Sequence, residues 1–358
     1  MPDRASEKSS GGNFFEDFHV GDEIDHATPR TVTGGDAALY TALYGSRFAL
    51  HSSDEFARAC GFERAPLDDL LVFHVVFGKT VPDISLNAVA NLGYADCLFH
   101  RPVYPGDTLT ATSRVIGVRQ NSNGRTGTVY VRTSGRNQRG ETVVEFIRWV
   151  MVNKRNESSP APEPVVPDLP ETATPGAAAF EPSHYDAALA GSPHLWDDYQ
   201  PGERIDHHGG VTMEEAEHMM AARLYHNTAA VHFDGLAAQA SRHGRRIVYG
   251  GHVISHARSL SFNGLANAIS IAAINGGRHV APMFAGDTLY AWSKVLEKFP
   301  LAGRDDLGLL RLRTVAAKDQ PCADFPYKTA DGGYHPAVVL ELDYTILMPR
   351  QHPGRDGI

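Results

Sequence analysis

The sequence contains little cysteine and no long apolar run. Its three cysteines, Cys60, Cys97 and Cys322, are odd in number and far apart, so a disulfide framework is not expected. A helix that spans a bilayer needs about 18 or more apolar residues, and no such run exists. The polar opening MPDRASEKSSGGN also lacks the apolar segment of a secretory signal. These absences predict a cytoplasmic protein with no membrane partner.

Positive charge is also scarce. The 358 residues carry 33 Lys and Arg against 42 Asp and Glu, a net charge of −9. No basic stripe is present to follow a phosphate backbone, so we exclude a nucleic-acid partner. The sequence has no P-loop, GxGxxG, GxSxG, HExxH or paired CxxC pattern, and we therefore expect no cofactor and no metal. The length suggests two domains.

A compositional break divides the chain. The stretch SSPAPEPVVPDLPETATPGAAA is rich in Pro and Ala, which is typical of a semi-extended linker. We predict a disordered lead over residues 1–12 and an N-terminal domain over 13–155. The linker then covers 156–191, a C-terminal domain covers 192–350, and a tail covers 351–358.

The two predicted domains are repeats of each other. FEDFHVGDEIDH, from Phe15, matches WDDYQPGERIDH, from Trp196, at an offset of 196 − 15 = 181, and RPVYPGDTLTATSRV recurs as APMFAGDTLYAWSKV. Several motifs in one order indicate a duplicated fold. In each copy a helical stretch comes first, and three alternating runs typical of strands follow the GDTL turn. This pattern predicts an α+β fold in which a sheet wraps a helix.

The densest polar cluster, YHNTAAVHFD, follows the helical stretch of the second copy. Asn227 and His232 are too far apart for one face of a regular helix, so they converge only if the chain bends between them. His232 is then a candidate acid and base, and Asn227 a candidate for orienting water or a carbonyl. The alternative is a partly buried histidine that is satisfied by a backbone carbonyl, and composition alone favours it.

A second cluster, IVYGGH, precedes another helical run. Gly250 and Gly251 would let a ligand approach the backbone and would present N–H groups to an oxyanion, although a turn that needs glycine geometry explains them equally well. Tyr249 and His252 flank the pair and are candidate substrate contacts. His252 and His256 have the spacing of metal ligands, but no carboxylate at a suitable spacing accompanies them, so no metal site is predicted.

In the first copy, polar residues interrupt the apolar run FHVVFGKTVPDISLNAVAN. Because buried polar groups need partners, this run is a candidate pocket wall, and Lys79 would suit an anionic group. A helix that ends at Pro82 with its polar face in solvent is an equally good interpretation. The candidate substrate contacts in this run are His74, Lys79, Asp83, Ser85 and Asn87.

With these motifs, both halves resemble the MaoC-like (R)-specific enoyl-CoA hydratase superfamily. This resemblance implies a double hot-dog fold, in which two antiparallel sheets each wrap a central helix. The superfamily's helix motif reads G-D-x-N-P-x-H-x-D. In the second half Asn227 stands at the Asp position, His232 at the His position and Asp234 at the last Asp. Gly250 and Gly251 fall where the oxyanion-hole glycine lies. The resemblance implies that His232 carries the proton and that Asn227 orients the water.

The first half departs further from this motif. His51 matches the His, but Ser46 stands at the Asp position. By this resemblance the N-terminal domain is non-catalytic and supplies the substrate tunnel, whereas the C-terminal domain is catalytic.

Longer strings, among them FHVVFGKTVPDISLNAVANLGYAD and FAGDTLYAWSKVL, are similar to the mesaconyl-CoA hydratase branch of this superfamily. That resemblance implies reversible hydration of mesaconyl-CoA to β-methylmalyl-CoA, as in the ethylmalonyl-CoA pathway, with a CoA thioester substrate, no cofactor and a homodimeric assembly. The free carboxylate of the substrate would need a group such as Lys79, His74 or an arginine. A general (R)-enoyl-CoA hydratase, a hot-dog thioesterase and a non-catalytic acyl-CoA-binding protein are the alternatives.

Overall fold

The computed structural model describes residues 8–176 and 180–351. Within these residues, eleven strands form one antiparallel sheet in the order β1-β3-β4-β5-β2-β8-β11-β10-β9-β6, and β7 pairs with β9. The first half supplies β1 (Glu23–Thr31), β2 (Ala88–Phe99), β3 (Thr108–Gln120), β4 (Thr126–Arg136) and β5 (Thr142–Asn153). The second half supplies β6 (Arg204–Asp206), β7 (Val211–Thr212), β8 (Ser270–His279), β9 (Thr288–Pro300), β10 (Leu307–Lys318) and β11 (Val338–Pro349).

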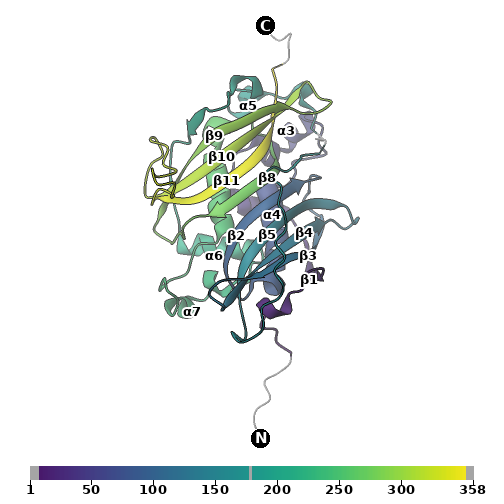
Figure 1. The fold of residues 1–358 in the computed structure, drawn as a ribbon. Coiled ribbons are helices and arrows are strands. Elements are labelled where there is room, and N and C mark those ends of the chain that lie inside the picture. Colours follow the sequence, from purple (N-terminus) through teal and green to yellow (C-terminus); the bar gives the residue numbers. More distant parts are fainter. Residues whose placement is uncertain (1–7, 177–179, 352–358) are drawn as a thin grey trace, which may run out of the picture.

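The strand order is the same in both halves when it is followed from the outer edge inward. β1, β3, β4, β5 and β2 correspond to β6, β9, β10, β11 and β8, and β2 pairs with β8 where the halves meet (Figure 1). Tyr94 there lies opposite Gly277, and Cys97 opposite Ile274. The duplicated fold is therefore confirmed. The two separate sheets expected from the sequence are corrected to one, because pairing at β2 and β8 satisfies backbone groups that two exposed edges would leave open.

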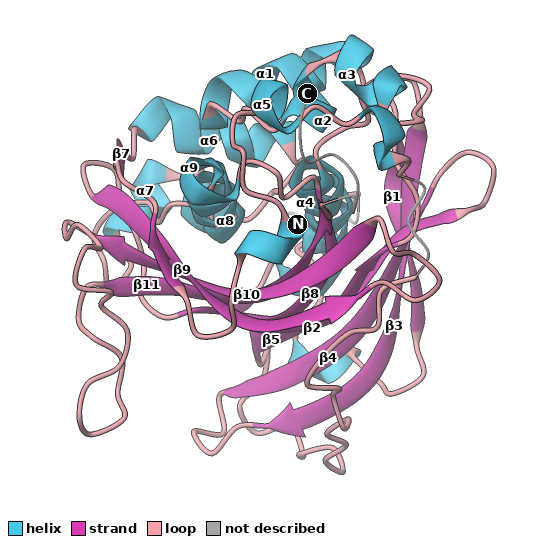
Figure 2. Cartoon of the chain, turned by 90° about the horizontal axis from the view of Figure 1, so that it is seen from above, coloured by secondary structure: helices cyan, strands magenta, loops and turns pink. Residues whose placement is uncertain are grey.

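Two central helices, α4 (Asp69–Thr80) and α8 (Gly250–Leu260), lie on the concave side of the curved sheet (Figure 2). Asp68 caps α4 by accepting a hydrogen bond from the Leu70 N–H, and residues 70–80 are all buried. A helix that is apolar on every side suits such a position between a sheet and other helices. The helices outside this pair are α1 (Gly34–Tyr44), α2 (Ala49–Ser52), α3 (Asp54–Ala59), α5 (Ala187–Ala190), α6 (Glu215–Leu224), α7 (Gly235–Gln239) and α9 (Phe262–Leu265).

The end of α4 departs from a regular helix. Pro82 lacks an N–H and crowds the carbonyl four residues earlier, so α-helical bonding stops at Thr80 and the π-helical turn η2 (Val81–Ser85) follows. The interpretation that the polar residues of this helix face solvent is wrong for His74 and Lys79, since both are buried. A π-turn of this kind often marks a functional site.

The linker crosses the outer face of the sheet. Val165 forms an isolated bridge with Val118 of β3, and the Ala173 N–H donates to Asn275 Oδ1 at 3.0 Å. Ile274 of β8 belongs to the core on the helix side, so its neighbour Asn275 faces the opposite side. The linker also contains the short helices η3 (Pro182–His184) and α5. The predicted lead and tail lie partly outside the described residues, at 1–7 and 352–358.

In the part of the chain that the structure describes, no helix combines the length and the apolar character that a membrane crossing requires. The three cysteines are buried and free. The main core lies between the concave sheet face and the helices, and it is shared by both halves: Phe73 and Phe146 come from the first, Ile254 and Tyr344 from the second.

Candidate active site

A cavity of about 300 Å³ lies where the two halves meet. Its first-half wall comes from α4, η2, β2 and β5, and its second-half wall comes from residues 227–253 and the end of β8. Apolar side chains form much of this wall. The polar residues that line the cavity are Ser85, Asn91, Tyr94, Arg148, Asn227, His232, Arg242, His243, Tyr249 and His279.

A bend in the chain brings Asn227 and His232 to the same cavity. Helix α6 ends at Leu224, and His226 then adopts a left-handed conformation with φ of 54°. Asn227 follows, with its Oδ1 accepting a hydrogen bond from the Ala229 N–H at 3.0 Å, and His232 ends the short turn η5 (Ala230–His232). This is the bend that convergence of the two side chains required.

The surroundings of His232 keep its ring neutral, so that it can act as a base. Its Nδ1 lies 2.9 Å from the carbonyl oxygen of Ile247, which can only accept, so Nδ1 carries the proton and Nε2 keeps a lone pair. Burial lowers the pKa of His232 to about 4, so the ring is neutral near pH 7. The ring also packs edge-on against Tyr249, with 5.4 Å between the centroids. The alternative interpretation expected a histidine that contacts a backbone carbonyl, and this contact is present. It occupies Nδ1 and leaves Nε2 available to accept a proton.

Gly250 begins α8, so its N–H has no acceptor within the helix. A Cβ on Gly250 would lie 2.5 Å from the ring of His279, so only glycine fits beside that side chain. Gly251 does not line the cavity. A Cβ there would meet Tyr249 at 2.4 Å and His74 at 2.7 Å, which gives Gly251 a packing role between α8 and α4. Of the two glycines, Gly250 is the one placed to present its N–H to a ligand.

Tyr249 and Asn227 both line the cavity, and the Tyr249 hydroxyl lies 3.5 Å from Nδ1 of His74. Burial raises the pKa of Tyr249 well above its usual value, so the phenol stays protonated. Tyr249 and Asn227 are therefore neutral polar groups of the cavity wall.

Several predicted contacts lie elsewhere. His252 is buried against Tyr44, whose hydroxyl is 3.0 Å from its Nδ1, and its Nε2 lies 3.1 Å from that of His256. His74 is buried between aromatic rings, with a pKa lowered to about 3 by burial. None of these histidines lines the cavity of His232.

Of the other candidate contacts in the first half, one lines the cavity of His232 and the rest lie elsewhere. Asp83 pairs with His26 at 2.7 Å, and Asn87 donates to the carbonyl of Gly11 at 2.8 Å. Each side chain therefore connects two segments of the first half. Ser85 alone among the five predicted contacts in this run lines the cavity with His232.

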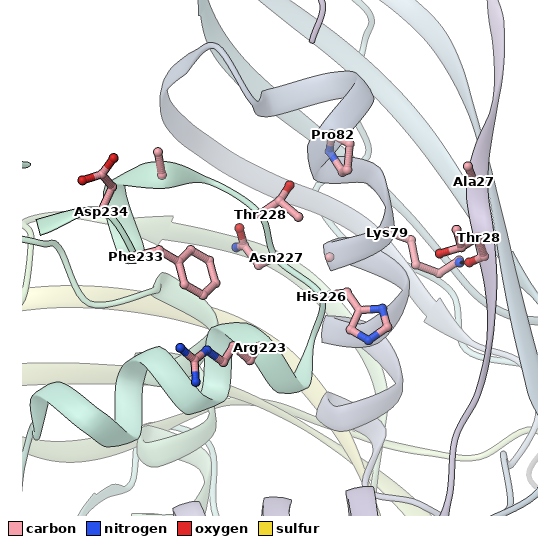
Figure 3. Close-up of a pocket in the computed structure, with 12 residues that line it drawn as sticks. Ala27, Thr28, Lys79, Pro82, Arg223, His226, Asn227, Thr228, Phe233 and Asp234 are labelled. Carbon is pink, nitrogen blue, oxygen red and sulfur yellow. Dashed lines mark hydrogen bonds between the residues drawn. The ribbon is translucent and has the colours of Figure 1, made fainter. Parts of the chain in front are cut away.

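Lys79 lies in a second cavity of about 640 Å³, on the other side of residues 226–234. Figure 3 shows its side chain extending toward Thr28, whose carbonyl accepts its hydrogen bond. Arg223 and His226 line the same cavity. Asn227 lines both cavities, whereas Lys79 lines only this one.

The corresponding site of the first half has lost its glycine. His51 Nδ1 lies 3.2 Å from the carbonyl of Pro66, fifteen residues later, the spacing that also separates His232 from its carbonyl partner. At the offset of 181, however, Asp69 replaces Gly250 (250 − 181 = 69). Burial raises the pKa of Asp69 to about 6. A carboxylate at this point would repel an oxyanion, whereas the glycine of the second half would not.

Sequence reasoning missed Tyr94, Arg148 and His279, whereas Asn91 belongs to the run that was predicted to be a pocket wall. A signal existed for Arg148, because it occupies an inward position of an alternating strand between Phe146 and Val150, where an apolar residue is expected. Within the described residues, no group of three or more His, Cys, Asp or Glu side chains converges as a metal site would require.

The fold matches a crystal structure of a MaoC domain protein dehydratase from Chloroflexus aurantiacus, with a TM-score of 0.93 and 64% identity over 97% of this chain and 100% of that chain. The fold and the site define a MaoC-like double hot-dog protein. A family model described as Mesaconyl-CoA hydratase matches residues 1–325. The chain belongs to the mesaconyl-CoA hydratase family.

Two curated relatives extend over nearly the whole chain. The β-methylmalyl-CoA dehydratase of Chloroflexus aurantiacus is 64% identical over 97% of this chain and 99% of the relative. The mesaconyl-CoA hydratase of Cereibacter sphaeroides is 57% identical over 96% of this chain and 100% of the relative. The family expected from the sequence is confirmed.

Proposed function

We propose that this protein is a hydro-lyase that reversibly adds water to mesaconyl-CoA (2-methylfumaryl-CoA) and gives β-methylmalyl-CoA. The observation that carries the proposal is that an unprotonated Nε2 of His232 and the helix-start glycine Gly250 line one cavity. The substrate assignment draws its support from the two relatives, which are named for the two directions of this reaction.

The thioester oxygen accepts a hydrogen bond from the Gly250 N–H. Negative charge that develops on this oxygen is stabilised there, at the positive end of the α8 dipole. Water held at His232 attacks the β-carbon, and Nε2 takes a water proton as the C–O bond forms. The same proton then passes to the α-carbon, which restores the carbonyl and the neutral imidazole. The sum is one water added across the double bond.

The mouth of the cavity suits the phosphate end of CoA. Arg242 is exposed and lines the cavity together with His243, to which it donates at 2.9 Å. Arg245 follows on the same loop and lies over the ring of Phe284, with 4.0 Å to the centroid. In a chain with a net charge of −9, such a local group of cations attracts phosphates. We place the nucleotide of CoA at this loop and the acyl group inward, toward Gly250.

The test is the fate of mesaconyl-CoA with the purified chain, followed by enoyl-thioester absorbance and confirmed by the mass of the product. Loss of absorbance with the gain of one water is the expected result. Crotonyl-CoA turnover equal to or faster than that of mesaconyl-CoA would indicate a general enoyl-CoA hydratase instead. Release of free CoA thiol would indicate a thioesterase, and tight binding without turnover an acyl-CoA-binding protein.

A cytoplasmic location and a homodimeric assembly are further parts of the proposal. Three buried, free thiols suit a reducing compartment. The homodimer stays a prediction from the family resemblance.

A further inference from the structure

Arg148 is a fully buried cation for which no carboxylate partner is found in the described residues. Its side chain is 0% exposed, and its hydrogen bonds go to two hydroxyls: Thr80 Oγ1 at 2.6 Å and Ser85 Oγ at 3.3 Å. Its Nε has no hydrogen-bond partner among the residues that the structure describes. The guanidinium lies 4.3 Å from the centroid of the Phe77 ring. A buried charge without a counter-ion is costly. Because the described residues supply none, its retention calls for a bound anion.

The polar groups around Arg148 are also incomplete. Thr80 donates its own proton to the carbonyl of Phe77 at 2.7 Å, whereas Ser85 is only an acceptor from Arg148 among the hydrogen bonds of the described residues. Both polar atoms of the Asn91 amide are buried and have no hydrogen-bond partner in the described part of the chain. Ser85, Asn91 and Arg148 line the same cavity as His232, so this end of the cavity presents unused donors.

Two side chains, those of Tyr94 and His279, lie between Arg148 and Gly250. Arg148 of β5 lies directly opposite Tyr94 of β2, so the two side chains project from the same face. The Tyr94 hydroxyl is 3.2 Å from His279 Nε2, and His279 in turn packs on Gly250. One contiguous row of contacts thus joins the buried guanidinium to the helix-start glycine.

The proposed substrate carries an anion at the matching point. In mesaconyl-CoA the free carboxylate is bonded to the β-carbon, which is the atom that water attacks. A thioester bound at Gly250 with its β-carbon at His232 therefore places this carboxylate inside the cavity. Arg242 is the other arginine that lines the cavity within the described residues, and it lies exposed at the mouth.

We propose that Arg148 and Ser85 bind the free carboxylate of the substrate and so select 2-enoyl thioesters with a carboxylate on the β-carbon, an assignment that rests on the proposed hydratase function. Ser85 donates its hydroxyl proton to the carboxylate, and the guanidinium compensates the charge. Asn91 supplies a further amide donor. Lys79, the sequence-based candidate, takes no part, because it lies in the other cavity and donates to Thr28. Burial lowers the pKa of Arg148 to about 10, which leaves it charged at neutral pH.

Two pairs of thioesters test this assignment. Mesaconyl-CoA is compared with tiglyl-CoA, in which a methyl group replaces the carboxylate, for kcat/KM. The saturated analogues methylsuccinyl-CoA and 2-methylbutyryl-CoA are compared for Kd by calorimetry, because they bind without reaction. We expect the wild-type protein to prefer the carboxylate member of each pair by about 100-fold, and Arg148→Met to reduce both preferences to about two-fold while the values for the neutral member change little.

Two further variants keep the test decisive. Arg258→Met is the matched control, since Arg258 is also buried over a phenylalanine, with 3.6 Å to the Phe48 centroid, but does not line the cavity; we expect it to keep the preference. If Arg148→Met does not fold, Ser85→Ala replaces it and should lower the preference by about ten-fold.

An absent wild-type preference for carboxylate analogues, or an equal loss for both members of each pair in Arg148→Met, would overturn the proposal. Hydration of mesaconyl-CoA by that same protein would leave the hydratase function standing. A wild-type protein that prefers methylsuccinyl-CoA but does not hydrate mesaconyl-CoA would keep the carboxylate site and refute the hydratase function.

Discussion

Gly78 of α4 lies directly against the backbone carbonyl of Tyr225, so closely that a Cβ on Gly78 would be 1.7 Å from that oxygen. The same Cβ would lie 3.3 Å from the backbone nitrogen of Asn227. A helix of the first half therefore packs against, and supports, the segment of the second half that carries Asn227 and His232. The N-terminal half shapes the candidate site by contact as well as by lining the cavity.

Gly78→Ala should disrupt the site. The added methyl group meets backbone atoms that have to move, and overpacking of this kind costs about 1–3 kcal/mol. We expect a lower midpoint of thermal unfolding and a decrease in kcat of at least about ten-fold, because Asn227 and His232 shift together. Gly34→Ala is the control, since a Cβ there meets nothing within 4 Å. Equal unfolding midpoints and equal kcat values for the two variants would contradict the idea that Gly78 supports this segment.

His232→Ala should lower kcat for mesaconyl-CoA by about 10²–10⁴-fold, the usual contribution of an acid–base group. His51→Ala is the matched control, because His51 makes the equivalent carbonyl contact in the first half. Steady-state kinetics and a circular dichroism spectrum of each variant form the measurement. Near-normal turnover in His232→Ala refutes the role of His232, and a comparable loss in His51→Ala refutes a non-catalytic first half.

Asn227→Asp should shift the preference of the enzyme toward neutral substrates. An aspartate at this position would place a second negative charge near the carboxylate on the β-carbon, and two unit charges at about 4 Å repel by about 4 kcal/mol even at an effective dielectric constant of about 20. We expect kcat/KM for mesaconyl-CoA to fall by about ten-fold or more relative to that for tiglyl-CoA. A variant that gains activity on mesaconyl-CoA would show that the amide is not an adaptation to this charge.

Acid should destabilise the fold near pH 5 because buried histidines are held neutral. Five histidines have folded-state pKa values of about 3 or 4, lowered by burial from an unfolded value of about 6.5. At pH 5 the unfolded chain therefore binds more protons than the folded chain, so stability is present above pH 6.5 and is lost as pH falls toward 4. These residues are His74, His207, His232, His256 and His279.

The measurement for this prediction is the midpoint of urea unfolding at pH 7 and at pH 5. With about four to five protons taken up on unfolding, the free energy of unfolding changes by several kcal/mol per pH unit near pH 5. A midpoint that is constant over this range would show that these histidines are not held neutral by burial.

The sequence predicted much of the fold because the fold is built from local periodic patterns that occur twice. The run from Thr108 and its counterpart from Thr288 alternate strictly enough to define β3 and β9 almost to the residue. The bounds of α1 follow from the spacing of Tyr40 and Leu43 and from the cap at Thr33. β2 was not predicted as a strand, because its residues Asn91 and Gly93 interrupt the apolar alternation.

The candidate site was partly predictable for the same reason. His232 and Gly250 belong to local motifs, and the structure places both in one cavity. The sequence could not distinguish Ser85, which lines that cavity, from Lys79, which lies in the other. A π-helical turn from Val81 to Ser85 separates the two residues, and the face to which each side chain points depends on that turn.

By itself, then, the sequence determined the duplicated α+β architecture, the family and the local motif that carries His232, since each follows from short-range patterns and from repetition along the chain. Tertiary structure alone decided that β2 and β8 join the halves, that Gly78 supports the segment of Asn227, and that Arg148 is buried in the cavity with no counter-ion from the described residues. These are relations between residues 63 to 183 positions apart in the sequence, and they arise from tertiary packing within the first half and between the two halves.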